Sequence, residues 1–498
     1  MVEKRTVPIN FKSYEPAQHA QAEMKKKGFT LGMKLVISFL AVGLIPFVLL
    51  GVLTYGKSKS ALESQAFSQL ESVRAIKKAQ IDKFFHERKG DVGVLVETVN
   101  TLQEEAFAKL TAIREIKKNQ VQNYFNERTG DATVLSASAP VSSALHDIEA
   151  AFMAEGRRSG GARWKDAVNR HEKWLKKYKE EYGYYDLFLI ANDGDVVYTV
   201  AGESDLGANL LLGSLKDSPL GKLFRNARQK NSIQDFEPYA PSDGEPSAFI
   251  GAPIKSGGQT LGVVAMQISL KDINEIMNER NGLGKTGETY LVGQDHLMRS
   301  DSFLDAKNHS VAASFKNPAQ GSVNSEAAKK ALAGGSGAEV IIDYNGNPVL
   351  SSYTPVKVGD MTWALLAEID VAEAFSPVNT NGEEFFAKYV QMYGYYDLFL
   401  INPDGLIYYT AAKEADLHTN ILNGKFASSN LGSLVRRVSQ TRQYGIEDFA
   451  PYAPSNGEPA AFIAQPVIRG DKITTVVALQ LSIDAINEVM NQRDGMGQ

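Results

Sequence analysis

The sequence of 498 residues contains no cysteine and only seven histidines. Without cysteine, the chain can form no disulfide, thiolate zinc site, iron–sulfur cluster or cysteine nucleophile. The histidines form neither an HExxH motif nor a close pair, and a GxSxG motif is also missing. We therefore expect no metal, no cofactor and no catalytic residue, which makes an enzyme the least favoured class.

Excess positive charge is lacking too, since 53 basic residues stand against 58 acidic ones for a net charge of −5. This balance argues against nucleic acid as the main partner, because nucleic-acid binding usually requires a basic face. The pair Lys285-Thr286 resembles the end of a nucleotide-binding P-loop, but Glu279 occupies the place of its first glycine. With 43% hydrophobic and 22% charged residues, the composition is typical of folded domains.

Long apolar runs are rare, and the clearest lies near the N-terminus. Residues 35–55 carry no charge and, at about 1.5 Å of rise each, reach roughly the 30 Å thickness of a bilayer core. Lysines and arginines precede this run, so the positive-inside rule places the tail 1–33 in the cytoplasm. A signal peptide is the alternative, but its apolar core is usually shorter. We predict one uncleaved membrane helix over 34–55 in the inner (cytoplasmic) membrane, with the bulk of the chain periplasmic or extracellular.

A repeat of 40 residues lies within a helical segment predicted over 56–155. Apolar residues recur there at spacings of three and four, as on one face of a helix, and such a stripe must be buried. Two interpretations stay open: a stalk that forms a homodimer through this stripe, and an intramolecular helical hairpin broken near Gly90 and Gly130. The basic pair Lys117-Lys118 is expected to be solvated. The matched positions include Phe85/Phe125, Arg88/Arg128 and Asp91/Asp131.

A second, larger repeat fills much of the remaining chain. The segment YGYYDLFLI at 182–190 recurs unchanged at 393–401, and DFEPYAPSDGEPSAFI at 235–250 recurs as DFAPYAPSNGEPAAFI at 448–463. Each copy predicts a β-hairpin, a helix and then a three-strand antiparallel meander. Residues 286–376 repeat this theme in different residues. The predicted fold class is α+β: one N-terminal transmembrane helix, a long α-helical stalk and tandem lobes with antiparallel sheets.

These features together carry a resemblance to a known family. A membrane anchor, a long helix and the stretches YDLFLI, GLGKTGETYLVG and WALLAEIDVAEAF resemble the extracytoplasmic double-Cache sensor of bacterial methyl-accepting chemotaxis receptors, whose lobes are PAS-like. The resemblance extends over about residues 34–498. It implies a membrane-distal Cache lobe at 156–285, a second Cache lobe at 286–376 and, beyond that pair, a duplicated lobe at 377–498.

The sequence departs from that family after the second lobe. A third lobe begins where such receptors return to the membrane, and neither a HAMP linker nor a methyl-accepting domain is present in the sequence. The sequence stops at a point where the first copy continues into the next lobe. We therefore expect the duplicated lobe to be truncated.

The resemblance also implies that a small molecule binds between the sheet and the helical side of the membrane-distal lobe. Lobes of this family that bind amino acids hold the ammonium group with an aspartate on the last strand, where this sequence has Gln267 and Gln480. A neutral amide anchors a cation weakly, so an α-amino acid is less favoured, whereas an arginine beside aromatic residues suits a small carboxylate. The candidate ligand-binding residues are Tyr198, Arg225, Asp235, Tyr239 and Gln267, and in the second copy Tyr409, Arg436, Asp448, Tyr452 and Gln480.

The function predicted from these patterns is ligand sensing by a transmembrane chemoreceptor, in which a bound ligand changes helix packing. The alternatives are the sensor region of a histidine kinase or of a cyclic-dinucleotide enzyme, and a membrane-anchored binding protein with no output domain.

Among the candidate ligand-binding residues, Asp235 and Tyr239 are expected on the same face of a strand, because they lie four residues apart. For every candidate residue, packing or solvation is the competing explanation.

Overall fold

A computed structural model describes residues 28–493 except 376, 379 and 380. Most of the predicted cytoplasmic tail, residues 1–27, therefore lies outside the described residues. The chain divides into two compact units, one made of 1–81 with 492–498 and the other of 82–491.

Helix α1 (Leu31–Ser136) contributes residues to both units. Its N-terminal part contains a stretch that is long and apolar enough to cross a membrane, and none of that stretch is buried. Pro46 lies inside the helix, as membrane-spanning helices tolerate.

The helix is continuous through both glycines of the 40-residue repeat. Gly90 and Gly130 lie inside α1, so the interpretation as a hairpin broken near these glycines is wrong. A glycine in a helix costs only about 1 kcal/mol relative to alanine, which contacts between α1 and the lobes can offset.

The first lobe is built on a five-stranded antiparallel sheet with the strand order β2-β1-β5-β4-β3. A hairpin, a helix and a three-strand meander follow one another, which confirms the order predicted from the sequence. Its elements are α2 (Ala139–Ala154), α3 (Ala162–Glu181), β1 (Asp186–Ala191), β2 (Val196–Thr199), α4 (Pro219–Ala227), β3 (Ser232–Pro238), η1 (Ala240–Ser242), β4 (Pro246–Ser256), β5 (Gln259–Gln267) and α5 (Leu270–Asn278).

The second lobe has a four-stranded antiparallel sheet with the order β6-β9-β8-β7. Asn345 and Gly346 lie between β7 and β8, so the hairpin turn predicted there is confirmed. Its elements are β6 (Glu288–Val292), α6 (Ala306–His309), α7 (Val311–Lys316), α8 (Pro318–Gly321), α9 (Glu326–Leu332), β7 (Gly337–Ile342), β8 (Pro348–Val358), β9 (Met361–Asp370) and α10 (Val371–Phe375).

The third lobe repeats the sheet of the first, with five antiparallel strands in the order β11-β10-β14-β13-β12. The three antiparallel sheets and the long N-terminal apolar helix confirm the predicted α+β class. The elements of the third lobe are α11 (Phe385–Tyr393), β10 (Tyr395–Ile401), β11 (Ile407–Thr410), α12 (Asn430–Thr441), β12 (Gly445–Pro451), β13 (Pro459–Arg469), β14 (Lys472–Leu481) and α13 (Ile483–Asn491).

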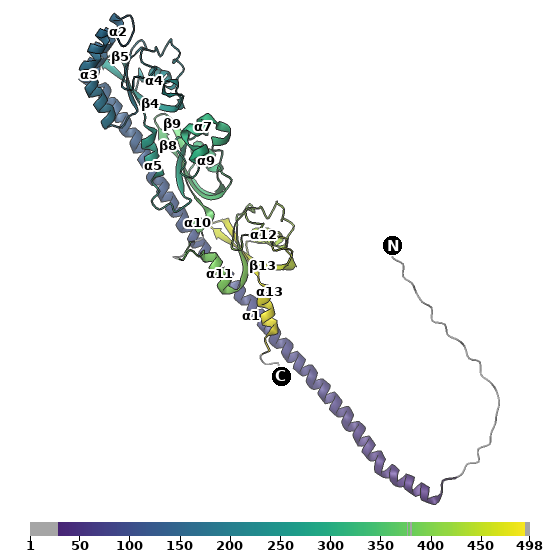
Figure 1. Ribbon diagram of the computed structural model, residues 1–498. Coiled ribbons are helices and arrows are strands. Elements are labelled where there is room, and N and C mark those ends of the chain that lie inside the picture. The colour runs from purple at the N-terminus through teal and green to yellow at the C-terminus, as the bar shows by residue number, and fades with distance from the viewer. Residues whose placement is uncertain (1–27, 376, 379–380, 494–498) are drawn as a thin grey trace, which may run out of the picture. The chain divides into compact units, whose positions relative to one another are not determined.

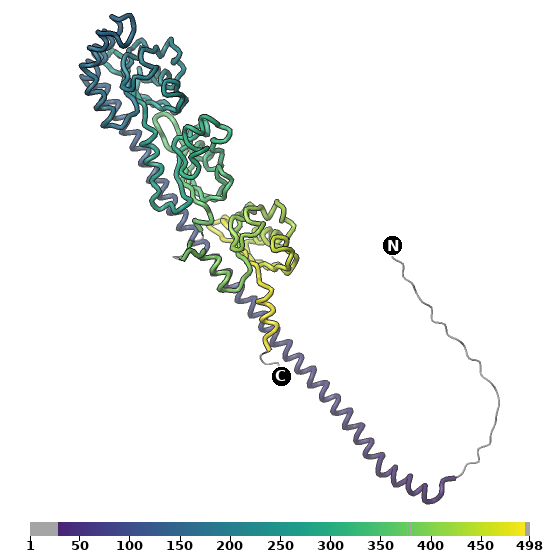
Figure 2. The backbone as a smooth tube through the Cα atoms, in the orientation of Figure 1, coloured from purple at the N-terminus to yellow at the C-terminus, as the bar shows by residue number. Residues whose placement is uncertain are grey.

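Within the unit 82–491, the three lobes lie one after another beside α1 (Figures 1 and 2). Each outer lobe buries apolar side chains on both faces of its sheet. One face lies against α4 in the first lobe and against α12 in the third. The other face lies against α1, and in the first lobe against α2 and α3 as well, where the largest cluster also joins the first lobe to the second.

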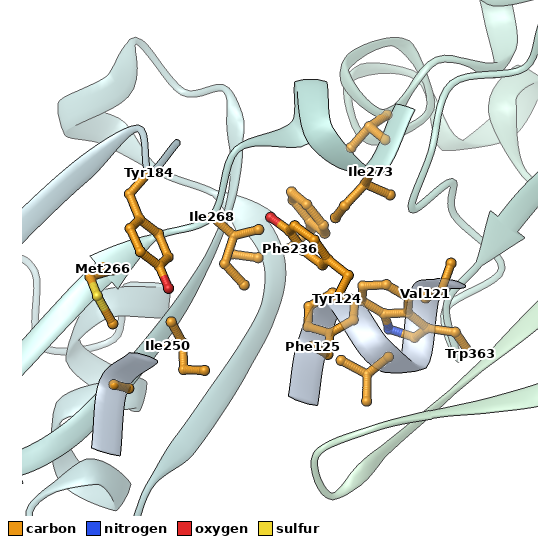
Figure 3. Packing of buried hydrophobic residues seen from close by; sticks show 14 of the residues in the cluster. Val121, Tyr124, Phe125, Tyr184, Phe236, Ile250, Met266, Ile268, Ile273 and Trp363 are labelled. Atoms are coloured by element: carbon orange, nitrogen blue, oxygen red, sulfur yellow. The ribbon is translucent and has the colours of Figure 1, made fainter. Parts of the chain in front are cut away.

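Aromatic residues of α1 form the centre of that largest cluster (Figure 3). Tyr124 and Phe125 are buried, and the Phe125 ring meets the Trp363 ring of the second lobe edge-on at 5.3 Å. Phe236 of the first lobe lies 6.3 Å from the same Trp363 ring. Because burial of apolar surface contributes about 25 cal/mol per Å², this cluster is a main source of stability for both lobes.

One polar contact accompanies the apolar packing between α1 and the first lobe. The Tyr184 hydroxyl donates a hydrogen bond to Asp131 of α1 at 3.0 Å, and Arg128 pairs with the same carboxylate at 3.1 Å. The Arg128 guanidinium also lies over the Tyr184 ring, 5.2 Å from its centroid, and donates to the Tyr182 carbonyl at 3.0 Å. We call Arg128, Asp131 and Tyr184 the first clasp.

The same contact recurs between α1 and the third lobe. The Tyr395 hydroxyl donates to Asp91 at 2.9 Å, and Arg88 pairs with Asp91 at 2.9 Å. Arg88 lies 4.9 Å from the centroid of the Tyr395 ring and donates to the Tyr393 carbonyl at 3.0 Å. We call Arg88, Asp91 and Tyr395 the second clasp.

The two clasps join the two repeats of the sequence to each other. The α1 members of the clasps are matched positions of the 40-residue repeat, and the tyrosines are matched positions of the lobe repeat. Each helical repeat is therefore the attachment site of one outer lobe. The apolar stripe of α1 was one reason to expect a dimer. In the structure, Val99 and Leu110 of this stripe are buried against the third lobe. A homodimer through α1 stays a prediction.

Lys117 is not solvated as expected. It is 3% exposed, donates to the Ile276 carbonyl at 2.5 Å and lies 3.6 Å from the Glu279 carboxylate. Burial lowers the pKa of Lys117, and the nearby Glu279 opposes that shift. The expectation was wrong because the long side chain of lysine reaches past the apolar stripe to the end of α5.

The clasps predict lobe-specific effects of two matched substitutions. Asp131→Ala leaves Arg128 without its carboxylate and should weaken attachment of the first lobe by about 2 kcal/mol. Asp91→Ala should weaken attachment of the third lobe instead. Hydrogen exchange of residues 182–190 and 393–401 distinguishes the two cases. Faster exchange in the same lobe for both variants would contradict the assignment, and Glu127→Ala, at an exposed position of α1, is the control that should change neither.

Candidate ligand-binding site

A cleft of about 460 Å³ opens in the first lobe where β1 begins and β5 ends. Its other walls are the loop between β3 and β4 and, from the second lobe, Ala312 of α7. Small-molecule sites typically measure about 300–1,000 Å³, so the cleft is large enough for a metabolite. The polar residues that line it are Tyr185, Ser242, Asp243, Glu245, Ser247, Gln267, Ser269 and Lys271.

Gln267, predicted as a site residue, lies in this cleft at the end of β5. Its Nε2 donates to the Ser247 hydroxyl at 2.9 Å and to the Ser242 hydroxyl at 3.4 Å, while the side chain is only 5% exposed. Its Oε1 has no hydrogen-bond partner among the described residues. A buried acceptor left unpaired costs free energy, so an N–H or O–H group that reached this oxygen, from a ligand or from water, would be stabilised there.

The orientation of the Gln267 amide follows from its neighbours. The Ser242 hydroxyl donates to Glu203 at 2.9 Å, and the Tyr185 hydroxyl donates to the other oxygen of Glu203 at 2.8 Å. An ionised carboxylate only accepts, so Ser242 must donate to it and then accept from the Gln267 nitrogen. The amide oxygen is thereby left as the free end. The hydrogen bond to Glu203, together with burial, raises the pKa of Tyr185 to about 12.

The third lobe contains the same chain of hydrogen bonds around Gln480. Tyr396 donates to Glu414 at 2.7 Å, Ser455 donates to Glu414 at 2.8 Å, and the Gln480 nitrogen donates to Ser455 at 3.3 Å. Oε1 of Gln480 is again unpaired among the described residues. The third lobe differs by one residue, since Ala460 takes the place of Ser247.

Tyr239 and Tyr452 are both fully buried and satisfied within their lobes. Tyr239 donates to Asp205 at 2.8 Å, and Tyr452 donates to Asp416 at 2.6 Å. Burial raises the pKa of Asp205 to about 6, against the stabilising hydrogen bond from Tyr239. Tyr239 is not among the residues that line the cleft, so its hydroxyl secures the loop that carries Asp205.

The tyrosines of the second strand also lie apart from the cleft. Tyr198 is 2% exposed in the cluster between the sheet and the α1 side, and its hydroxyl has no partner among the described residues. Burial raises the pKa of Tyr198 above its usual range. Its counterpart Tyr409 donates to Glu384 at 2.9 Å. Tyr198 is therefore packed within that cluster, and Tyr409 is hydrogen-bonded within its own lobe.

The two predicted arginines hold loops of their own lobes. Arg225 of α4 donates to the Lys216 carbonyl, and Arg436 of α12 donates to the carbonyls of Leu422 (3.2 Å) and Ala427 (2.5 Å). Arg225 does not line the cleft, where Lys271 is the cationic lining residue beside Asp243 and Glu245. The structure therefore gives no support to an arginine that binds a carboxylate there.

Asp235 joins two lobes instead of facing a ligand. Arg299 of the second lobe pairs with both of its oxygens, at 2.7 and 3.0 Å, and the Trp363 indole donates to it at 3.3 Å. The expectation that Asp235 and Tyr239 share a strand face was wrong, because a register shift between Gln234 and Glu237 breaks the alternation along β3. The matched Asp448 is exposed and accepts a bond from the Phe449 nitrogen at 2.7 Å.

Sequence reasoning missed several polar residues of this region. Asp186 is fully buried opposite Gln267 and accepts from the Thr199 hydroxyl at 2.6 Å and from the Ala201 nitrogen at 2.8 Å. In the third lobe, burial raises the pKa of the matched Asp397 to about 7. The signal that could have found these residues is their recurrence in both copies: Asp186/Asp397, Glu203/Glu414, Asp205/Asp416 and Ser242/Ser455.

The second lobe contains a separate pair of buried carboxyl groups. Glu288 and Glu368 lie opposite each other on β6 and β9. Tyr290 and Ser351 donate to Glu368 at 2.8 and 2.7 Å, and Ser302 donates to Glu288 at 2.7 Å. Burial raises the pKa of Glu368 to about 8. Within the described part of the chain, no group of three or more histidine or acidic side chains is placed to hold a metal ion.

Comparison with known proteins identifies the family of this fold. The family model of the Cache domain matches residues 58–378, so the chain belongs to the Cache domain family. That match contains the first and second lobes and ends before the third. No match was found among the curated proteins.

Solved structures with a similar fold are sensor domains of bacterial receptors. The ligand-binding domain of the Pseudomonas fluorescens chemoreceptor CtaA, in complex with L-isoleucine, is 15% identical, covers 55% of this chain and 97% of its own, and has a TM-score of 0.37. The periplasmic sensory domain of the Campylobacter jejuni chemoreceptor Tlp1 is 17% identical, with 56% and 100% covered and a TM-score of 0.39. The Vibrio cholerae histidine kinase DctB sensor domain is 11% identical, with 55% and 98% covered and a TM-score of 0.38.

The buried Glu368 predicts a pH dependence of stability. Between about pH 4.5, its ordinary pKa, and about pH 8, the unfolded chain loses this proton while the folded chain keeps it. The folded state then binds more protons, so this residue makes stability fall as the pH rises through that window. Glu368→Gln has no proton to lose, so it should remove the contribution of this residue, make the slope shallower and raise stability near pH 8.

Chemical denaturation of the purified chain at several values between pH 5 and 8 measures this effect. Glu326→Gln, at an exposed position of α9, should keep the slope of the parent chain. A slope unchanged by Glu368→Gln would show that this carboxyl is already ionised in the folded protein.

Proposed function

We propose that this chain is the ligand-sensing region of a membrane-anchored bacterial receptor of the chemoreceptor type, and that a small molecule binds in the cleft beside Gln267. The single observation that carries this proposal is the unpaired Oε1 of Gln267, a buried acceptor fixed in orientation at the wall of a cleft of metabolite size. Membership of the Cache domain family supports the role in ligand sensing.

The lining of the cleft favours a ligand that donates hydrogen bonds. Gln267 offers an oxygen, and Asp243 and Glu245 add two carboxylates against the single cation of Lys271. An amine, amide or hydroxyl group has the donors that such a wall requires. A ligand that donates hydrogen bonds therefore takes the place of the small carboxylate expected from the sequence. The two predicted arginines donate to backbone carbonyls of loops and not into the cleft.

Signalling follows from the position of the cleft between two lobes. A ligand there contacts β5 of the first lobe and approaches α7 of the second, so it favours one packing of the two lobes over another. Both lobes bury side chains against α1, which gives the helix a part in the change. In the proposed receptor, the change is transmitted along α1 to a membrane span at 34–55. Residues 1–33 lie in the cytoplasm and the lobes lie outside. The receptor functions as a homodimer.

Two other functions share this architecture. A histidine kinase or a cyclic-dinucleotide enzyme uses the same kind of sensor region with a different output, and a membrane-anchored binding protein uses it with none. A receptor requires that ligand alters α1, whereas a passive binding protein does not. Hydrogen exchange of residues 112–136, measured with and without ligand, therefore distinguishes a receptor from a passive binding protein.

A thermal-shift screen of the full chain tests the proposed site. Primary amines, small carboxylates and purines are the three compound classes, and any compound that binds the folded state raises the melting temperature. We expect an amine, at a concentration of about 100 times its Kd, to add about 2.7 kcal/mol of stability. Gln267→Ala should abolish the shift.

The third lobe supplies the matched control for this screen. Gln480→Ala removes the equivalent amide and should leave the shift of a first-lobe ligand intact. The serines beside Gln267 keep their own acceptors after its removal, since Ser242 donates to Glu203 and Ser247 donates to the Glu245 carbonyl. A shift retained in Gln267→Ala would place the ligand elsewhere, and a shift confined to carboxylates would overturn the proposed chemistry.

A further inference from the structure

The second lobe covers one face of the first lobe through a charged contact. Asp235 on β3 receives two hydrogen bonds from Arg299, which is 2% exposed, and one from the indole of Trp363. Its Oδ1 also accepts from the Phe236 nitrogen at 2.8 Å, which fixes the carboxylate toward the second lobe.

Helix α5 forms the other half of that covered face. The Asn274 amide donates to Asp301 at 2.8 Å and accepts from the Asp301 nitrogen at 2.8 Å. The Met277 side chain is fully buried, and its carbonyl accepts from the Thr289 hydroxyl at 2.6 Å. The covered face therefore combines ion pairs, an amide contact and apolar side chains.

The third lobe presents the counterparts of these residues to solvent. Ile446 is 42% exposed and Met490 is 48% exposed, and Asp448 and Asn487 are exposed as well. Their counterparts in the first lobe are less exposed. Ile233 is half-buried and Met277 is fully buried. We call Ile446, Asp448, Asn487 and Met490 the third-lobe face.

The third-lobe face keeps the geometry that the first lobe uses for contact. A register shift between Glu447 and Ala450 repeats the one in β3. Asp448 Oδ1 accepts from the Phe449 nitrogen at 2.7 Å, as Asp235 does from Phe236. In the described residues, no side chain donates to the carboxylate of Asp448.

Five residues of the first lobe at this contact recur unchanged in the third lobe. Lys230 is an exception, because it pairs with Asp360 of the second lobe at 2.7 Å and is replaced by Gln443. Several adjacent positions have changed as well. The identical pairs are Ile233/Ile446, Asp235/Asp448, Phe236/Phe449, Asn274/Asn487 and Met277/Met490. The changed pairs are Gln234/Glu447, Glu237/Ala450, Lys271/Asp484 and Asp272/Ala485.

We propose that the third-lobe face is a binding surface for a further Cache lobe of the second-lobe type, one that places an arginine and a tryptophan against Asp448. The carboxylate of Asp448 binds the guanidinium, and Ile446 and Met490 are covered by apolar side chains of that lobe. The second lobe of the same chain is not this partner, because its Arg299 and Trp363 are both bonded to Asp235. The inference goes beyond ligand sensing and stands whether or not the cleft binds a small molecule.

The first test uses the 498-residue chain and a matched pair of substitutions. Asp235→Ala breaks an existing contact between lobes, so exchange of the amide hydrogens of residues 232–238 should accelerate about tenfold. Asp448→Ala should leave exchange of residues 445–451 unchanged in the same chain. If Asp448→Ala accelerates exchange there to a similar extent, Asp448 serves its own lobe and the proposal is overturned.

The second test adds the proposed partner to the full chain. Residues 286–376 are added again after Gln498. This position corresponds to the junction after Lys285, because the last six residues align with Arg280–Lys285 and share its arginine and both glycines. Exchange of residues 445–451 and 483–491 should slow about tenfold in this extended chain. Asp448→Ala should remove the slowing, and Glu458→Ala, at another exposed acidic position of the lobe, should keep it.

Each other outcome contradicts the proposal. No slowing in the extended chain, when exchange of the added residues shows that the added lobe is folded, means that the face does not bind such a lobe. Sedimentation of the unextended chain checks a different occupant. If that chain dimerises and Asp448→Arg dissociates it, the face binds a second copy of the chain and the proposal is wrong.

Discussion

The attachment of each outer lobe to α1 is the constraint on which the rest of the arrangement depends. In both clasps, a carboxylate on the helix holds a tyrosine at the start of the sheet, and an arginine one turn away covers the ring of that tyrosine. Tyr184 lies just ahead of β1, which begins at Asp186, and Tyr395 is the first residue of β10, which carries Asp397, so the clasp sets the position of the polar network next to it. A helical segment and its lobe thus form one structural unit, and this unit occurs twice.

That unit explains where a ligand can and cannot bind. Both faces of the first-lobe sheet carry apolar clusters, one against α4 and one against α1, α2 and α3, and the predicted pocket groups Tyr198 and Tyr239 are buried in these clusters. The end of β5 is different, because a hydrogen-bonded chain from Tyr185 through Glu203 and Ser242 fixes Gln267 at an open cleft. The binding chemistry is therefore expected at the lobe boundary, where a ligand can also influence how two lobes pack.

Much of this fold could be predicted from the sequence, and the reasons are local. The Asn345-Gly346 turn and the alternating apolar runs determine hairpins and strand order through short-range chemistry. Gln267 could be predicted because it takes the place, on the last strand, of the aspartate with which related lobes hold an ammonium group. Asp235 was misassigned because a β-bulge reverses the side-chain alternation, and Lys117 because its partner lies 159 residues away in the chain. Such contacts depend on tertiary packing that periodicity does not encode.

A double-mutant cycle tests most directly whether each helical repeat holds its own lobe. The pairs are Arg128→Ala with Tyr184→Phe inside the first clasp, and Arg128→Ala with Tyr395→Phe across the two clasps. Residues in contact show coupling energies of about 0.5–3 kcal/mol, whereas distant pairs add within about 0.5 kcal/mol. We predict clear coupling for the pair inside the clasp and additivity for the pair across the clasps. Additivity in both cycles, or equal coupling in both, would contradict the account.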